Sequence, residues 1–218
     1  MVTVYKRKET SDPAVSFPSS TRSPPCQSTK TMPAKVEKVS TPKKTPRTLA
    51  RCSAVRTLAE RVAPGGVKGI EPVPEPLEHA RAHAAGRADV EFALGDVYAL
   101  DDPDGSYDVV HAHQVLQHLV DPVAALREML RVCRPDGVVA VRDADYAAMA
   151  WYPADPRLDR WLEVYRAVAR SNGAEPDAGR RLLSWARAAG AADIVATASV
   201  WCYATPADRQ WWGGMWAD

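Results

Sequence analysis

The chain has 218 residues, of which 46% are hydrophobic, and its formal net charge is +1. This is the size of one ordinary domain, with enough apolar residues to form a core. The four cysteines lie far apart and form no CxxC pair, which argues against a zinc site and a disulfide framework. No apolar run is long enough to span a bilayer and no secretory signal is evident, so we expect a cytoplasmic protein that makes no use of a membrane.

The charge is divided unevenly along the chain. Residues 1–47 hold ten Lys or Arg against three acidic residues, about +7, which leaves about −6 for residues 48–218. The first segment is rich in Pro, Ser, Thr and Lys and poor in large apolar residues, so we predict a disordered basic tail over 1–47. Such a tail is also suited to contact nucleic acid or a membrane surface. A solvated tail without a partner is the favoured interpretation.

The elements predicted for the first half follow in chain order: a helix over 48–62, a strand over 67–70, a helix over 74–85, strands over 90–94 and 107–112, a helix that begins after Asp121, and a strand over 138–141. Asp121 is a candidate N-cap with Pro122 at the first helical position. The Pro135–Gly137 turn ends that helix. The short apolar run over 138–141 is typical of a strand buried on both faces of a parallel sheet.

The second half reads as mostly helical. We predict helices over 157–171 and 177–189, an apolar segment over 194–203, and a last helix from Pro206. All seven tryptophans lie at or after Trp151. Rings at helical spacing are usually core residues, so we expect Trp161 and Trp185 in the core. Trp211 and Trp212 are expected to be exposed, in a patch that favours association.

Strands that alternate with helices predict an α/β sheet, and open sheets of this kind bind ligands at the carboxyl ends of their strands. Glu71 ends the first of these strands, where a carboxylate can accept both hydroxyls of a ribose. Asp96 ends the next, where an acceptor can meet an adenine amine, although a turn-forming Gly-Asp pair is an equal alternative. His113 and Gln114 end the third.

These strand ends lie within sequences that resemble a known family. VKGIEPVPEPLEHAR, VEFALGDVYALDDPDGSYDVVHAHQVLQHLVDP and ALREMLRVCRPDGVVAVRD resemble the class I S-adenosylmethionine-dependent methyltransferases, particularly the quinone-biosynthesis branch, over residues 53–145. The resemblance implies a Rossmann-like, mostly parallel sheet of seven strands with flanking helices and bound S-adenosylmethionine. By this likeness Glu71 holds the ribose hydroxyls, Asp96 holds the adenine amine, Val97 lends its backbone, and His113 lies beside the methionine moiety.

The same resemblance implies where the methyl acceptor binds. The segment after the fifth strand often shapes the acceptor pocket in this family, so we expect Tyr146 and Trp151 to line it, with Asp145 and Tyr152 as further candidates. Gln114, at the end of an earlier strand, is expected to line the same pocket. For the tyrosine and tryptophan side chains, core packing is an equal alternative. The acceptor implied is a small molecule with an O, N or C nucleophile.

One family feature is missing. The first motif of the family is a strand followed by a GxGxG loop, because only Gly allows such close approach of the backbone to the cofactor. This chain has no glycine before Gly65, and KKTPRTLARC stands where the loop belongs. Lysine also gives way to arginine near residue 50, which suggests a junction, and we hypothesise a divergent or wrongly joined coding segment before it.

The chain is also expected to lack the family's final antiparallel strand. We therefore predict an incomplete methyltransferase-like domain over 48–218, without its first and last strands. Its cofactor half is placed at 53–145 and its acceptor half at 146–218.

The histidines permit a metal-site reading, since His111 and His113 share a face of one strand and His118 follows. No carboxylate or cysteine completes a ligand set, so no metal site is predicted. His113 is the best candidate for a general base, because its pKa is expected near neutrality. Methyl transfer needs no base in principle, since alignment of the nucleophile with the methyl group can suffice.

Three classes of function remain open. The first is methyl transfer from S-adenosylmethionine, which loss of the glycine loop would impair, and the intact Glu71 and Asp96 favour it. The second is a non-catalytic interaction module or truncated relic, which the missing glycines favour. The third is nucleic-acid binding through the tail, which the acidic charge of 48–218 and the absence of a recognition motif disfavour.

Overall fold

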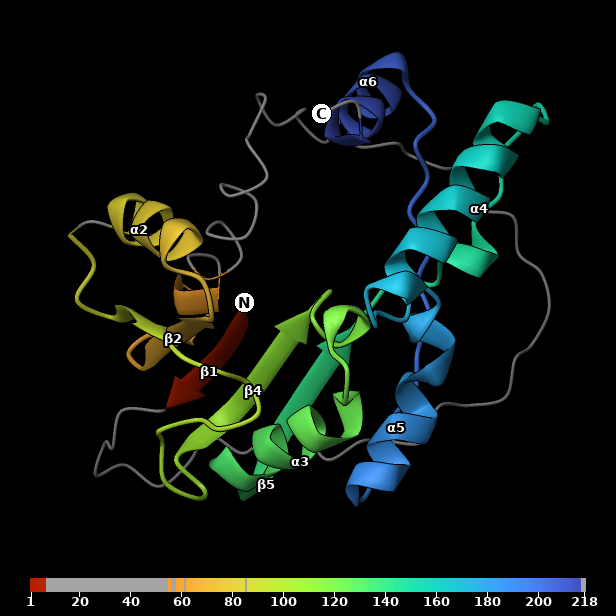
Figure 1. Ribbon diagram of the computed structural model, residues 1–218. Coiled ribbons are helices and arrows are strands. Elements are labelled where there is room, and N and C mark those ends of the chain that lie inside the picture. The colour runs from red at the N-terminus through yellow and green to blue at the C-terminus, as the bar shows by residue number, and fades with distance from the viewer. Residues whose placement is uncertain (7–54, 56–57, 61, 85, 217–218) are drawn as a thin grey trace, which may run out of the picture.

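The computed structural model describes residues 1–6, 55, 58–60, 62–84 and 86–216. Its sheet has five strands in the order β3-β2-β1-β4-β5 (Figure 1). The strands are β1 (Val2–Lys6), β2 (Gly66–Glu71), β3 (Val90–Leu94), β4 (Tyr107–His113) and β5 (Cys133–Arg142). β2 pairs with β3, and β4 pairs with β5, in parallel. The fold is the Rossmann-like α/β sheet with flanking helices that the sequence predicts.

The central strand comes from the N-terminal tail. β1 lies between β2 and β4 and runs antiparallel to both. Val2 and Val4 point into the main core, where Val4 is fully buried. The prediction of disorder over 1–47 is therefore wrong for the first six residues, since apolar burial and pairing on both edges hold this strand in place. The rest of the predicted tail lies outside the described residues, as do the sequence KKTPRTLARC and most of the helix predicted over 48–62.

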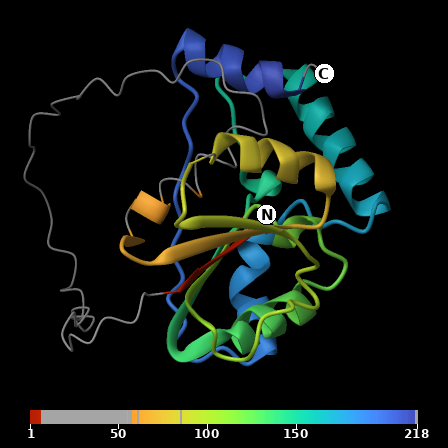
Figure 2. The same ribbon diagram turned by 90° about the vertical axis from the view of Figure 1, so that its left-hand side faces the viewer.

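Helices cover both faces of the sheet, as Figure 2 shows from the side. α2 (Pro74–His83) packs on β2 and β3, while α3 (Pro122–Val132) and α5 (Leu182–Ala189) lie on the opposite face. Asp121 is the N-cap of α3, and its side chain accepts a hydrogen bond from the Ala124 N–H at 2.9 Å. The stretch predicted as a helix over 177–189 is divided into η3 (Ala178–Arg181) and α5.

β5 forms one edge of the described sheet. Val138 is 56% exposed, so the prediction that 138–141 is buried on both faces is wrong. Among the described helices, α3 packs on β5 from the face of Val139 and Val141, which leaves the face of Val138 open. Val139 and Val141 on the other face do pack against the core. The apolar segment over 194–203 has no regular secondary structure, and Val195 and Val200 are exposed.

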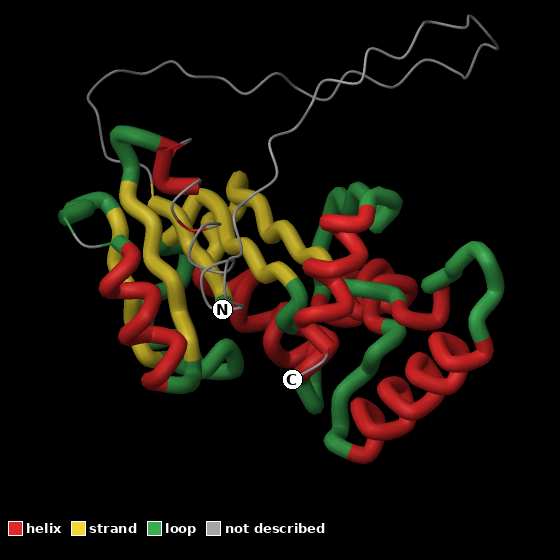
Figure 3. Tube along the Cα trace, turned by 90° about the horizontal axis from the view of Figure 1, so that it is seen from above, coloured by secondary structure: helices red, strands yellow, loops and turns green. Residues whose placement is uncertain are grey.

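α4 (Pro156–Ser171) and α6 (Pro206–Trp216) lie beyond the carboxyl ends of β4 and β5 rather than over a face of the sheet (Figure 1). Figure 3 shows this separation of the helical part from the strands in a view from above. Trp161 stacks on Tyr165 within α4 and meets Trp216 of α6 at a ring-centroid distance of 5.1 Å. Trp161 therefore belongs to an aromatic cluster between two helices and not to the main core.

The predictions for Trp185 and Trp211 are confirmed, since Trp185 packs against the main core and Trp211 is exposed. The predicted exposure of Trp212 is wrong, because its ring is half-buried and meets Trp161 at a centroid distance of 5.2 Å. Within the described residues, no helix is long and apolar enough to cross a membrane.

Candidate functional site

The parallel strands bring their carboxyl ends to one edge of the sheet. Glu71 ends β2, Asp96 follows β3, and His113 and Gln114 follow one another at the end of β4. The register pairs Val2 of β1 with both Ile70 and Ala112. The predicted residues of β2 and β4 therefore lie on either side of the start of β1, at what we call the carboxyl edge.

Glu71 is closed off at this edge. It is only 4% exposed, and its Oε2 lies 3.4 Å from the backbone nitrogen of Met1. This contact follows directly from the direction of β1, which begins at the carboxyl edge and runs away from it. A ribose can reach the Glu71 carboxylate only if Met1 moves aside.

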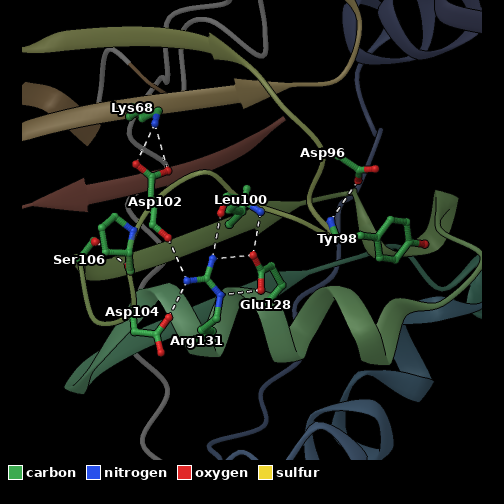
Figure 4. A network of polar contacts seen from close by, with 10 residues as sticks. Lys68, Asp96, Tyr98, Leu100, Asp102, Asp104, Ser106, Glu128 and Arg131 are labelled. Carbon is green, nitrogen blue, oxygen red and sulfur yellow. Dashed lines mark hydrogen bonds and ion pairs between the residues drawn. The ribbon is translucent and has the colours of Figure 1, made fainter.

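Asp96, by contrast, is exposed at the end of β3. Its Oδ1 accepts a hydrogen bond from the Tyr98 N–H at 3.0 Å, which shapes the turn (Figure 4). Gly95 precedes it, and a Cβ there would lie 2.9 Å from Ile70 Cγ2, so only glycine allows this close approach to β2. The carboxylate is thus held at the surface and is open to a hydrogen-bond donor.

The loop after Asp96 is fastened to α3 by one arginine (Figure 4). Arg131 donates to the carbonyl oxygens of Leu100 and Asp102, both at 2.9 Å, and to Glu128 Oε1 at 2.7 Å. Glu128 Oε1 in turn accepts the Leu100 N–H at 2.7 Å. The Arg131 hydrogen bonds lower the pKa of the Glu128 carboxyl, with a smaller contribution from the Leu100 N–H. This network keeps the loop, and with it Asp96, in a defined place.

Val97 is buried in the main core. Its side chain therefore anchors the loop and is not available to a ligand. Only its backbone can serve the role that the family resemblance implies.

His113 lies at the surface of the carboxyl edge beside His111 of the same strand, with ring centroids 6.3 Å apart. Desolvation by its neighbours lowers the pKa of His113, and the positive charges of Arg142 and His111 lower it further. Trp201 approaches the same ring edge-on at 6.1 Å. His113 is therefore neutral near pH 7, as a proton acceptor must be.

Gln114 adopts a left-handed backbone conformation, with φ of 52°. Its N–H donates to the carbonyl oxygen of Arg142 at 2.7 Å. This bond holds the end of β4 against the end of β5, in a conformation that costs a non-glycine residue about 1 kcal/mol or more. Gln114 is half-buried at the carboxyl edge.

The predicted acceptor residues separate in the structure. Tyr146 is buried and meets Tyr165 at 4.4 Å and Trp216 at 6.3 Å between ring centroids, so its ring belongs to the aromatic cluster of α4 and α6. Trp151 is half-buried, whereas Tyr152 is 99% exposed. Asp145 accepts a hydrogen bond from Arg180 at 2.8 Å. No described contact joins these side chains into one pocket.

Asp143 and its hydrogen-bond partner Gln117 were not singled out from the sequence. Asp143 follows β5, and its Oδ1 accepts the N–H of buried Gln117 at 3.1 Å, while its Oδ2 has no hydrogen-bond partner among the described residues. Burial raises the pKa of Asp143 to about 7, against the lowering effect of nearby backbone N–H groups. The signal was present in the sequence, since Asp143 follows the apolar run over 138–141 just as Asp96 follows β3.

No group of three or more His, Cys, Asp or Glu side chains suited to a metal ion occurs in the part of the chain that the structure describes. The prediction of no metal site stays a prediction. The carboxyl edge offers hydrogen-bond acceptors and a neutral histidine instead.

Comparison with known proteins adds to this picture. Residues 51–141 match a family model described as "Methyltransferase domain". An uncharacterized methyltransferase of Schizosaccharomyces pombe is 38% identical over 160 residues, which cover 69% of this chain and 57% of that protein. The ubiquinone biosynthesis O-methyltransferase of Neisseria meningitidis is 39% identical over 88 residues, which cover 38% of this chain and 37% of that protein. The chain thus spans less than two thirds of the relatives that it matches.

Among solved structures, the YcgJ protein from Bacillus subtilis superposes with a TM-score of 0.42 at 27% identity, over 56% of this chain and 49% of that chain. This superposition is too loose to carry an argument about function. The family match covers β2 to β5 and includes Glu71, Asp96, Val97 and His113. Over residues 51–141, the chain is therefore similar to the methyltransferases, the family that the sequence motifs indicate.

Proposed function

We propose that this chain binds S-adenosylmethionine at the carboxyl edge of its sheet and transfers the methyl group to an O, N or C nucleophile of a small molecule. The observation that carries the proposal is Asp96, an exposed carboxylate held at the end of β3 by the Arg131 network. The family match over residues 51–141 supports it.

The residues at this edge fit the cofactor in part. Asp96 and the Val97 backbone would hold the adenine, and His113 would lie beside the methionine moiety. Glu71 would hold the ribose hydroxyls once Met1 has moved from its carboxylate, which it now approaches to 3.4 Å. The bound cofactor supplies an electrophilic methyl group on a sulfonium. Gln114 and the half-buried Trp151 would position the acceptor, whereas the ring of Tyr146 lies in the aromatic cluster. Neutral His113 would take the acceptor's proton where the acceptor carries one.

A second candidate is a non-catalytic module, and the closed surroundings of Glu71 favour it. The family's glycine loop joins a central parallel strand to a helix at the carboxyl edge. Here the central strand is antiparallel, so at this edge it presents Met1 instead of such a turn. The described residues at this edge therefore do not supply the contacts that a glycine loop would make with the cofactor, and each such hydrogen bond is worth about 1 kcal/mol or more.

Calorimetric titration with S-adenosylhomocysteine separates the two candidates. We expect binding that Asp96→Ala weakens at least about tenfold, because a hydrogen bond to a charged group is worth about 1.5–3 kcal/mol. Asp101→Ala is the matched control, since Asp101 is an exposed aspartate of the same loop. Absence of binding by a chain with a cooperative unfolding transition would remove methyl transfer and leave the interaction module.

A further inference from the structure

A cavity of about 130 Å³ lies within the sheet face that packs against α2. It is separate from the carboxyl edge described above. The described lining residues come from β1, from the strands β2 and β4 on either side of it, and from two helical positions before β2. They are Thr3, Tyr5, Leu58, Val62, Val67, Val109 and His111.

The strand register explains how the cavity is built. Tyr5 of β1 pairs with Val67 on one side and with Val109 on the other. Thr3 pairs with His111, one row nearer to the carboxyl edge. These residues form the floor, and the cavity therefore depends on the placement of β1 between β2 and β4.

The cavity is poor in polar groups that could hold water. The Tyr5 hydroxyl donates to the carbonyl oxygen of Val62 at 3.2 Å, so its proton is already used. Among the described residues of the lining, Thr3 and His111 are the remaining side chains with polar atoms. A buried water needs about two to four polar partners, and an apolar cavity of about 150 Å³ is known to stay dry and to bind benzene. A cavity of about 130 Å³ is close to that size.

His111 gives this cavity an uncharged polar contact beside Thr3. It is partly buried, and burial lowers its pKa, so the imidazole is neutral near pH 7. A neutral imidazole offers one donor and one acceptor nitrogen. The described lining thus combines an apolar wall with two uncharged hydrogen-bonding side chains, His111 and Thr3.

We propose that this cavity binds a small neutral aromatic molecule of about the size of benzene, with one hydrogen-bonding substituent placed against His111. The site is not part of the methyl-transfer proposal and does not rest on it. Apolar contact with the valines and Leu58 provides the affinity, and the substituent fixes the orientation of the ring.

The test uses toluene and phenol, two probes of nearly equal size that differ in a methyl and a hydroxyl group. Binding of each to the full chain is measured by ligand-observed NMR at pH 7.5. Val109→Phe places a ring in the cavity from its own floor, and we expect it to weaken both probes at least about tenfold. Val138→Phe is the matched control, because Val138 is the partner of Val109 on the neighbouring strand β5 and is 56% exposed.

A second variant keeps the test decisive if Val109→Phe fails to fold. His111→Leu is expected to weaken phenol about tenfold relative to toluene, as the loss of one hydrogen bond predicts. Failure of both probes to bind the wild-type chain would overturn the proposal, and so would equal binding to the wild type and Val109→Phe. An unchanged ratio of phenol to toluene in His111→Leu would overturn the contact with His111.

Discussion

Asp143 is expected to make the stability of this protein fall as the pH rises through the weakly acidic range. Burial raises its pKa to about 7 in the folded chain, against an ordinary value of 3.8. Between these two values the folded chain holds a proton that the unfolded chain has released. The stabilisation is therefore complete below about pH 4 and is lost as the pH rises toward 7.

The magnitude follows from the same shift. One pKa unit corresponds to about 1.4 kcal/mol, so the free energy of unfolding should fall by about 1.4 kcal/mol per pH unit within this range. From pH 5 to pH 8 the expected loss from this one group is about 3 kcal/mol. Asp143→Asn keeps an oxygen that can accept the Gln117 N–H but removes the titration. The variant should therefore lack this part of the pH dependence.

Urea unfolding at pH 5, 6, 7 and 8 measures the effect. The difference in free energy between Asp143→Asn and the wild type should grow in favour of the variant up to about pH 7 and then level off. Asp136→Asn serves as the control, because it removes an exposed carboxylate of the same strand, β5. A difference that stays constant from pH 5 to pH 8 would refute the reasoning, because it would mean that Asp143 is ionised throughout.

The remaining predictions concern the placement of the elements around the site. Val4→Ala should lower the free energy of unfolding by about 2 kcal/mol, since Val4 is fully buried in the central strand, whereas Val138→Ala at the exposed edge should cost less than about 0.5 kcal/mol in chemical denaturation. Arg131→Met should lower the urea midpoint more than Arg160→Met, because Arg131 bonds two loop carbonyl oxygens and Arg160 bonds only an exposed side chain on its own helix. Asp177→Ala should cost about 2 kcal/mol, since it removes the buried acceptor shared by two arginines of α4 and by the Ala147 N–H.

Local patterns were sufficient for most elements after residue 62. The apolar spacing after Asp121, together with Pro122 at the first helical position, predicted α3 and its N-cap, and the structure confirms both. Strand ends were equally readable, because the change from apolar to polar residues falls at Glu71 and His113. These features depend on neighbours in the sequence, so composition and periodicity report them.

Burial along β5 could not be read in this way. The run over 138–141 is apolar in sequence whether or not both of its faces are covered, and Val138 is exposed because α3 packs on the opposite face of β5. The aromatic cluster is a similar case. Trp161 and Trp216 are far apart in the chain, and only the approach of α4 to α6 brings their rings together.

The central strand shows most clearly the difference between what local sequence predicts and what contacts between distant residues decide. Val2–Lys6 alternates in a way typical of a strand, but the Pro-, Ser- and Lys-rich sequence after it predicted disorder. Which strand pairs with which is decided by contacts between residues far apart in the chain, and local propensity does not encode them. The sequence by itself determined the family motifs and the residues at the strand ends. Only the tertiary structure decided that β1 fills the centre in the antiparallel direction, which places Met1 against Glu71 and leaves Asp96 open.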